Sequence, residues 1–331
     1  ARVRIGRRSL LAAIVALASA CAAPLTHRAY VREAPYADAP LSPRARIFLV
    51  AGGDDVANFI DEVADQRRFW LAQGVAADEI ACYYAKPTRA AFRGDRAQYR
   101  RLFTELGGCY PASTALLRRH LAEASAHAPP FVYLYVTSHG LDGLIDEDAA
   151  LPPDERALLD RYVIQLGAGP GSGYRARAIL AAYRGGADPD DLLWTPDLMA
   201  ALLGAFPPQT PKIVVLQGCH SGGFIVEPRD RTAEVRALSN LTIIASARFD
   251  RTSFGCDAGP EQTYFGGLFG ALLRRLGEGK TPPEIAWRGL FRELRRGVGE
   301  LERREGATPS LPVFFSSAPA PDEAATAAGD G

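Results

Sequence analysis

The sequence predicts an α/β protein with a mostly parallel sheet flanked by helices, and three observations support this prediction. Short apolar runs alternate with longer segments whose apolar residues recur at helical spacing, which is typical of parallel strands joined by crossover helices. Several apolar runs end in glycine or small polar residues, as buried strands do at the edge of such a sheet. The 331 residues, of which 47 % are hydrophobic and 23 % charged, suffice for a substantial core.

Six apolar segments are expected to be strands. The first, "ARIFLVAGG", ends in two glycines, and the third, "FVYLYVTSHG", runs through six apolar residues into Thr-Ser-His-Gly. The fourth stops at Gln217 and continues as "GCHSGG". The expected strands lie within 45–53, 80–85, 131–140, 212–216, 241–247 and 311–315.

Helices are expected between these strands, and most begin at a recognisable cap. In the first, apolar residues from Val56 to Leu71 fall on one face after Asp54 or Asp55, either of which can cap it. The others are expected at 113–127 with Ser113 or Thr114 as cap, at 194–206 with Thr195 as cap and Pro196 at the first helical position, at 264–276, and from Thr281, where Pro282 and Glu284 complete a capping box.

Residues 141–191 are less regular and are expected to form an insertion over one sheet edge or near the site. The glycine-rich stretch 167–173 lacks the lysine and hydroxyl of a phosphate-binding loop, which excludes it as a nucleotide site of that kind. The carboxylates at 146–148 and 154–155 indicate a solvated loop or, alternatively, a calcium site.

The N-terminus is predicted to be an export signal. In residues 1–21, arginines precede a short apolar stretch, small residues and Cys21, which is the order of a bacterial signal peptide with a lipobox, and Arg7-Arg8 also resembles a twin-arginine signal. Lipidation of Cys21 is therefore expected. The apolar part is shorter than the ~20 residues that span a bilayer.

This signal sets the expected domain organisation and location. An Ala- and Pro-rich tether, 22–44, would join the anchor to a folded domain, 45–317, followed by a disordered tail, 318–331. The protein is expected in the periplasm or as a membrane-anchored lipoprotein of a bacterial envelope. Lys+Arg and Asp+Glu both number 38, so no basic field indicates nucleic acid as a partner. We expect no cofactor, and the histidines show no metal-ligand spacing.

Export would place the remaining cysteines, Cys82, Cys109, Cys219 and Cys256, in an oxidising compartment. Their even number permits two disulfides without requiring them. If Cys219 is catalytic, it must stay reduced, which leaves at least one other thiol unpaired. Cys82 with Cys109 is the preferred pair.

His139 and Cys219 are the candidates for chemistry. His139 lies at the carboxyl end of the third predicted strand, and Cys219 lies just beyond that of the fourth. Ligands of open α/β sheets bind at this end of the strands. An imidazolium beside a thiol lowers its pKa, and the histidine can protonate a leaving amine. The backbone N–H groups of Gly140 and Cys219 could stabilise an oxyanion. Side chains at Gly140 or Gly218 would crowd a substrate. Alternatively, the cysteine is an inert thiol and the histidine a strand-end cap.

The segments "YLYVTSHG" and "VVLQGCHSGGF" resemble the His-Gly and cysteine motifs of the legumain-like cysteine peptidases, family C13, which share a clan with caspases. The resemblance covers about residues 45–317 and implies a caspase-like (caspase/hemoglobinase) fold. It also implies a peptidase whose Cys/His dyad hydrolyses protein or peptide substrates through a thioester acyl-enzyme.

The resemblance assigns further site residues. Asn58 falls on the asparagine proposed to orient the catalytic histidine, and "ASARFDRTSFGC" puts Ser253 on the wall of the specificity pocket. Gln217 stands where legumains carry an acidic pocket residue. Ile60-Asp61 and Gly267 replace the other charged pocket residues, so specificity for asparagine does not follow.

Three functions remain open from the sequence. The first is a cysteine endopeptidase. The second is a transpeptidase or transamidase on the same dyad, in which an amine intercepts the acyl-enzyme. The third is a catalytically silent envelope lipoprotein that serves as a binding module.

Overall fold

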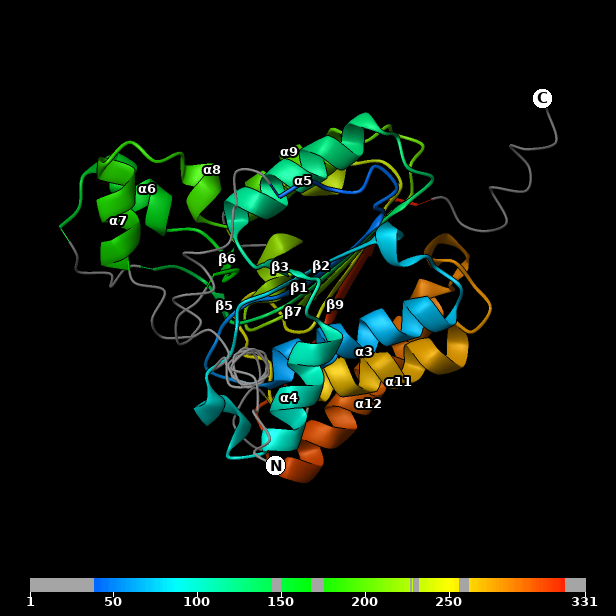
Figure 1. Ribbon diagram of the computed structural model, residues 1–331. Coiled ribbons are helices and arrows are strands. Elements are labelled where there is room, and N and C mark those ends of the chain that lie inside the picture. The colour runs from blue at the N-terminus through cyan, green and yellow to red at the C-terminus, as the bar shows by residue number, and fades with distance from the viewer. Residues whose placement is uncertain are drawn as a thin grey trace, which may run out of the picture.

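A seven-stranded sheet forms the centre of the molecule (Figure 1). The computed structural model describes residues 39–144, 150–167, 176–226, 228, 232–255 and 262–318. The strand order is β3-β2-β1-β4-β7-β8-β9, in which all neighbours are parallel except β8 and β9. The strands are β1 (Ile47–Ala51), β2 (Ile80–Tyr84), β3 (Tyr110–Pro111), β4 (Val132–Thr137), β7 (Lys212–Gln217), β8 (Leu241–Ala245) and β9 (Val313–Ser316).

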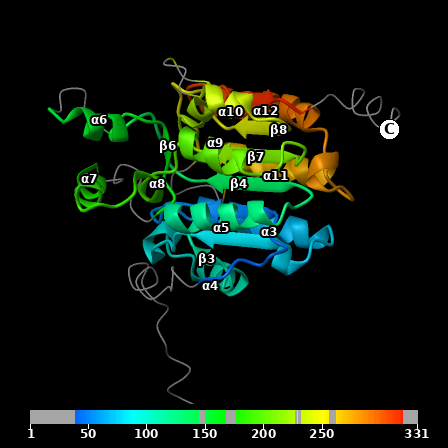
Figure 2. The same cartoon turned by 90° about the horizontal axis from the view of Figure 1, so that it is seen from above.

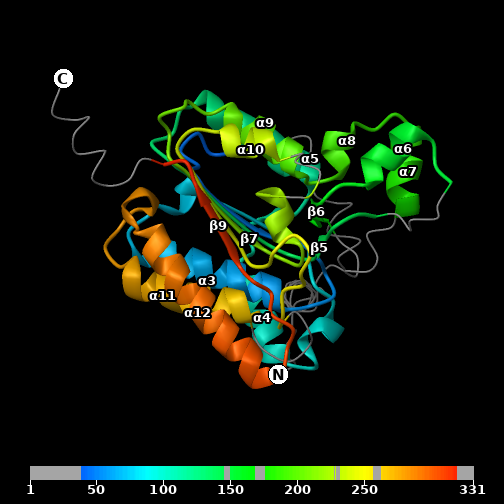
Figure 3. The same ribbon diagram turned by 180° about the vertical axis from the view of Figure 1, so that it is seen from behind.

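Helices cover both faces of this sheet, which confirms the predicted α/β class with a mostly parallel sheet. Figures 1 and 3 show α5 (Thr114–Ala126), α9 (Pro196–Gly204) and α10 (Ala233–Ala237) on one face. On the other face lie α3 (Asn58–Ala72), α4 (Arg96–Glu105), α11 (Tyr264–Leu276) and α12 (Trp287–Glu305). Alternate residues of each central strand enter the two apolar cores, as in β4, where Leu134 faces one core and Tyr135 the other.

Most predicted caps are present. Ser113 accepts a hydrogen bond from the N–H of Leu116 at the start of α5, and Thr195 accepts one from Leu198 in α9. The capping box of Thr281 and Glu284 closes a 3₁₀ turn, Pro282–Glu284, which precedes α12 instead of forming its first turn. The prediction for Asp54 and Asp55 is wrong, because Ala57 precedes α3 without a side-chain cap.

The insertion is more ordered than expected. It contains α6 (Pro153–Leu159), α7 (Ala176–Arg184) and α8 (Pro189–Leu192), which lie together to one side of the sheet (Figure 2). These segments enclose a small apolar cluster of their own, formed by Leu158, Leu159, Val163, Leu180 and Leu193. A two-stranded antiparallel ladder, β5 (Gly140–Leu141) with β6 (Val163–Ile164), joins the insertion to the exit of β4. The first group of predicted loop carboxylates, 146–148, lies outside the described residues. In the second group, 154–155, Glu155 forms an ion pair with Arg184.

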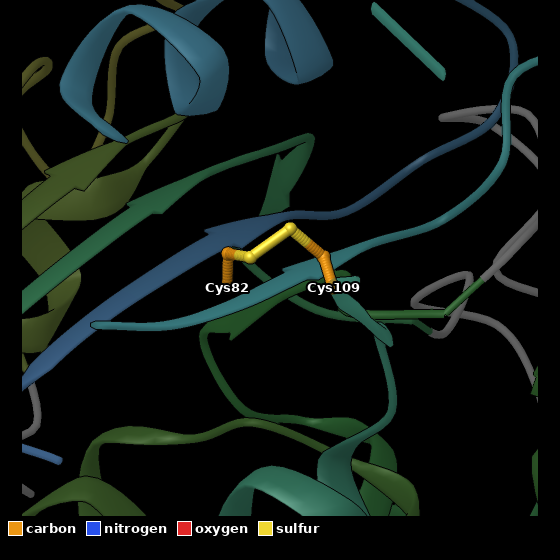
Figure 4. Close-up of a disulfide and its surroundings, with 2 residues drawn as sticks. All are labelled: Cys82 and Cys109. Carbon is orange, nitrogen blue, oxygen red and sulfur yellow. A yellow bond between two sulfur atoms is a disulfide. The ribbon is translucent and has the colours of Figure 1, made fainter. Parts of the chain in front are cut away.

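The preferred disulfide between Cys82 and Cys109 is present (Figure 4). It joins β2 to the turn before β3, across a sequence separation of 27 residues. The bond therefore fastens the outermost parallel strands of the sheet to each other.

The packed structure begins before the expected boundary at residue 45. The carbonyl of Ala39 accepts hydrogen bonds from His120 Nε2 and Arg119, and Tyr110 donates its hydroxyl to the carbonyl of Pro40. The last six residues of the expected tether, 39–44, therefore contact the domain. The predicted signal with Cys21, the rest of the tether, and the tail from residue 319 lie outside the described residues.

A buried lysine lies at the end of the sheet opposite the carboxyl ends of the parallel strands. Lys212 begins β7 there and is 2 % exposed. Its Nζ donates to the carbonyls of Pro207, Thr210 and Ser239. Burial lowers the pKa of this ammonium group.

None of the described helices has a stretch both long and apolar enough to cross a bilayer.

Candidate active site

The pairing register of β4 with β7 brings His139 and Cys219 to one edge of the sheet. The parallel ladder runs from Val132 opposite Lys212 to Thr137 opposite Gln217. His139 and Cys219 each follow this last pair by two residues. Because the strands are parallel and adjacent, both residues leave the sheet at the same end and next to each other.

The backbone segments that directly follow β4 and β7, the exits of these strands, pack closely against each other. A Cβ placed on Gly140 would lie 1.8 Å from the carbonyl oxygen of Cys219, and one on Gly218 would lie 2.7 Å from the carbonyl oxygen of Ser138. Any side chain at either position would separate the exits. Both positions therefore require glycine because of the neighbouring backbone. The predicted crowding of a substrate by side chains there stays a prediction.

His139 is held by Asp55, from the turn that follows β1. Its Nε2 lies 2.8 Å from Oδ1 of Asp55, and the two side chains are 15 % and 31 % exposed. The ring of Phe59 meets the imidazole edge to face, with centroids 5.0 Å apart. Because Nε2 is engaged by a carboxylate, Nδ1 is the ring nitrogen that can exchange a proton with a nucleophile.

Gly53 makes this arrangement possible. Its φ of +73° lets the chain turn after β1, and a Cβ there would lie 3.2 Å from Cδ2 of His139. Sequence reasoning treated Asp55 as a cap for α3 and missed its contact with the histidine. The one signal that could have found it is its place after β1, the parallel neighbour of β4.

Cys219 carries a thiol outside the disulfide and is partly exposed. Its Sγ lies 3.3 Å from the backbone nitrogen of Ser253, which donates to it, and 3.6 Å from the carbonyl oxygen of the same residue. The sulfur thus accepts from the N–H of Ser253 and, as a thiol, donates to the carbonyl of the same residue. The two contacts fix where the sulfur lies relative to the segment around Ser253.

The turn that presents Cys219 is fixed by the exit of β8. Ser246 accepts from the backbone N–H of Gly218 at 2.9 Å and donates to the carbonyl of the same glycine at 3.0 Å. His220 has a φ of +57° and donates its backbone N–H to the carbonyl of Arg251. The turn that carries the thiol is therefore hydrogen-bonded on both sides of Cys219.

The imidazole of His220 is held by the backbone of a neighbouring segment. Its Nδ1 lies 2.9 Å from the carbonyl oxygen of Phe249, to which a ring N–H donates. Asp142 is 3.9 Å from the same nitrogen. This nitrogen of His220 is therefore occupied by the backbone of Phe249.

The remaining sequence candidates surround the pair. Asn58 is buried at the start of α3, and its Nδ2 donates to the carbonyl of Gly255 at 3.0 Å. Ser253 contributes its backbone to the sulfur contact and is 5 % exposed. Gln217 is 1 % exposed, and its Oε1 lies 2.9 Å from Oγ1 of Thr137. Cys256 lies outside the described residues.

These side chains suit acyl transfer to a thiol. Among the described residues, no three His, Cys, Asp or Glu side chains gather as ligands for a metal ion. The arrangement offers a nucleophile, a histidine with a carboxylate partner, and the backbone N–H of Ser253 beside the sulfur.

Comparisons with known proteins found similarity in structure but not in sequence. No protein-family model and no curated protein matches the chain. Caspase-1 from Spodoptera frugiperda is 12 % identical with a TM-score of 0.45, and the match covers 85 % of this chain and 93 % of the caspase. Protein GSU0716 from Geobacter sulfurreducens is also 12 % identical, with a TM-score of 0.42, and the match covers 84 % and 95 % of the two chains.

Proposed function

We propose that the protein is a cysteine peptidase that cleaves peptide bonds with Cys219 and His139. The observation that carries this proposal is the register of Thr137 opposite Gln217, which sets the two residues at matching exits of adjacent parallel strands. The contact of the Gly140 backbone with that of Cys219 supports it, since it keeps the two exits together.

The proposed reaction begins when His139 Nδ1 takes the proton of the Cys219 thiol and Sγ attacks the peptide carbonyl. Asp55 holds the opposite ring nitrogen in its N–H form and stabilises the imidazolium that results. The backbone N–H groups of Gly140 and Cys219 donate to the oxyanion. His139 then gives its proton to the leaving amine, and water hydrolyses the thioester.

The family assignment is part of the proposal. We place the chain with the legumain-like peptidases on the strength of the motifs around His139 and Cys219. Specificity for asparagine is not included, because Gln217 stands in place of the acidic pocket residue. Its side chain is uncharged, buried and hydrogen-bonded to Thr137.

Turnover of a peptide library by the purified protein tests the proposed function. We expect Cys219→Ala and His139→Ala to lower kcat/KM by about 10³-fold or more, because each removes a reacting group. His220→Asn is the matched control, since Asn tolerates the left-handed backbone and His220 faces Phe249. Equal cleavage by the wild-type protein and Cys219→Ala would reject the dyad.

Two further assays on the same protein distinguish the other two functions. If an added amine such as glycinamide appears in the product in place of water, the protein is a transferase. An electrophilic peptide that fails to label Cys219 in the wild-type protein would indicate a binding module without catalysis.

We also propose that the protein is exported and tethered to a membrane through Cys21. The disulfide between Cys82 and Cys109 supports this location, because such bonds persist in oxidising compartments. We expect the full chain to fractionate with membranes and Cys21→Ala to be released from them. Equal fractionation of both proteins would contradict the lipid anchor.

A further inference from the structure

Glu62 is a buried carboxyl group close to the active site that the proposed reaction does not use. It lies in α3, one turn after Asn58, and is 2 % exposed. One oxygen, Oε2, lies 2.9 Å from the hydroxyl of Tyr135 and 2.6 Å from that of Thr137, both on β4. The other, Oε1, accepts from the backbone N–H and the hydroxyl of Thr263 at 2.8 and 2.6 Å.

This carboxyl group fastens the start of α11. Thr263 is the N-cap of that helix, and a Cβ on Gly266 would lie 2.1 Å from Cδ of Glu62, so glycine is what lets the helix approach. The next residue, Tyr264, donates its N–H to the carbonyl of Phe254, which follows Ser253 directly. Glu62 is therefore linked to the segment that contacts the Cys219 sulfur.

Glu62 is also linked to both strand exits through Thr137. The Oγ1 atom of Thr137 lies 2.6 Å from Oε2 of Glu62 and 2.9 Å from Oε1 of Gln217. A hydroxyl has one proton and cannot donate to both oxygens. Two arrangements resolve this conflict. In one, the amide of Gln217 turns so that its Nε2 donates to Thr137, which then donates to Glu62. In the other, Glu62 carries a proton, so that Oε2–H donates to Thr137, whose own proton goes to Gln217.

The surroundings of Glu62 favour the neutral acid. Burial raises the pKa of its carboxyl group, against the lowering effect of the hydrogen bonds from Thr137, Thr263 and Tyr135. The ionisable group in contact with it is Tyr135, whose own pKa is raised well above its usual value by burial and by the nearby carboxyl. On α3, the acidic residues Asp61 and Asp65 precede and follow it. These groups supply no positive charge that would hold Glu62 ionised.

We propose that Glu62 acts as a neutral acid that positions the Cys/His pair. Through Thr137 and Gln217 it fixes the residues two places before His139 and Cys219, and through Thr263 it fixes the segment that carries Ser253. This inference rests on the proposed function, because it gives Glu62 a role in that reaction.

Two substitutions of Glu62 and one matched control test this role. Glu62→Gln keeps the shape and can donate to Thr137 as the neutral acid does, whereas Glu62→Met keeps the volume and removes the hydrogen bonds. Gln66→Met is the control, since Gln66 is equally buried one turn along α3 and accepts from Tyr133 of the same strand at 2.9 Å. The measurements are kcat, KM and the rate at which iodoacetamide alkylates Cys219, read by mass spectrometry of its peptide.

We expect Glu62→Met to lower kcat about tenfold or more at nearly unchanged KM, and to slow alkylation of Cys219. Glu62→Gln is expected to keep kcat within about threefold of the wild type, and Gln66→Met to change neither rate. Losses in Glu62→Met no larger than in Gln66→Met would overturn the inference. So would a Glu62→Gln protein as impaired as Glu62→Met.

Alkylation separates this inference from the proposed function. If the wild-type protein cleaves no peptide but Glu62→Met still slows alkylation of Cys219 relative to Gln66→Met, the positioning role holds and the peptidase assignment fails. If Glu62→Met does not fold, Thr137→Val replaces it, because valine keeps the shape and removes the bridging hydroxyl. Unimpaired turnover and alkylation in that variant would overturn the role of the bridge.

Discussion

At the scale of single residues, the geometry of His139 depends on one carboxylate. Asp55 approaches Nε2 at 2.8 Å and is the acidic side chain that bonds the imidazole, while Asp54 precedes it in the same turn. The sequence shows two adjacent aspartates and does not say which one turns toward a residue 84 positions away. The choice is made by tertiary packing, in particular by Gly53 and Phe59 around the ring.

Asp55→Ala should therefore lower kcat by about 10–100-fold without unfolding the protein, because the histidine loses the group that orients it. Steady-state kinetics on the best library peptide measure this effect. Asp54→Ala is the matched control and should keep kcat within about twofold. Equal losses in the two variants would show that the turn, and not the Asp55 carboxylate, matters.

Gly140 is the second residue on which the site depends. Gly140→Ala should destabilise the protein by about 1–3 kcal/mol, because its Cβ would overlap the carbonyl oxygen of Cys219. Urea unfolding gives the free energy. The control is Gly143→Ala, whose Cβ would lie 3.7 Å from its nearest neighbour, the carbonyl oxygen of Leu159. A Gly140→Ala protein as stable as this control would mean that the two strand exits can move apart.

At the scale of elements, apolar runs predicted the central strands well, whereas polar elements were missed. β4 and β7 are buried at every position, and Val132–Val136 and Ile213–Leu216 within them are continuous apolar runs. Helix α4 buries only Leu102 completely and is defined mainly by its cap, Asp95, which accepts from the N–H groups of Ala97 and Gln98. β3 has two residues and exists only through its pairing with β2, so its sequence carries no strand pattern.

The turn before β2 provides a prediction for the effect of pH. Glu79 accepts from Arg44, Arg46 and the backbone of Ala76. Burial acts to raise the pKa of its carboxyl group, but the N–H of Ala76 and the two arginines outweigh burial and lower it. A lowered folded-state pKa means that the carboxylate stabilises the fold above its unfolded pKa of 4.5, and that this stability is lost as the pH falls through the lowered value.

We therefore expect Glu79→Gln to lower Tm at pH 7 and the difference from the wild type to shrink below pH 4.5. Thermal unfolding from pH 7 to pH 3 measures this difference. Glu123→Gln is a suitable control, since Glu123 is exposed and paired within its own helix. A constant difference across this range would show that Glu79 acts through packing instead of charge.

At the scale of the whole molecule, the sequence predicts the fold class and the end of the sheet that carries the site. It does not predict the side-chain contacts that join the helices to the sheet. The positions of His139 and Cys219 follow from strand order alone, because parallel neighbours end at one edge. Glu62 joins α3, β4 and α11, and Thr263 is 201 residues away in sequence. No local sequence pattern identifies Glu62 as such a link. Its helical spacing places it on the buried face of α3, but the apolar residues of that face have the same spacing.

The disulfide acts on the whole molecule through the unfolded chain. Replacing both Cys82 and Cys109 by alanine should cost about 3.5 kcal/mol, the loop-closure entropy for a separation of 27 residues. Urea unfolding of the double variant measures it, with wild type under reducing conditions as the comparison. A loss below about 1 kcal/mol would indicate that β2 and β3 stay together in the unfolded chain without the bond.

The two ends of the parallel strands differ in chemistry. Lys212, with its three carbonyl partners, lies at the amino end, and His139 and Cys219 lie at the carboxyl end. The reactive groups all leave the sheet at one end, while the opposite end is closed by a lysine whose donors are occupied. A resin, surface or fusion partner attached near Pro207 and Ser239 would leave the thiol facing the solution. An assay on immobilised protein can therefore be oriented by design, with coupling chemistry directed to the inert end.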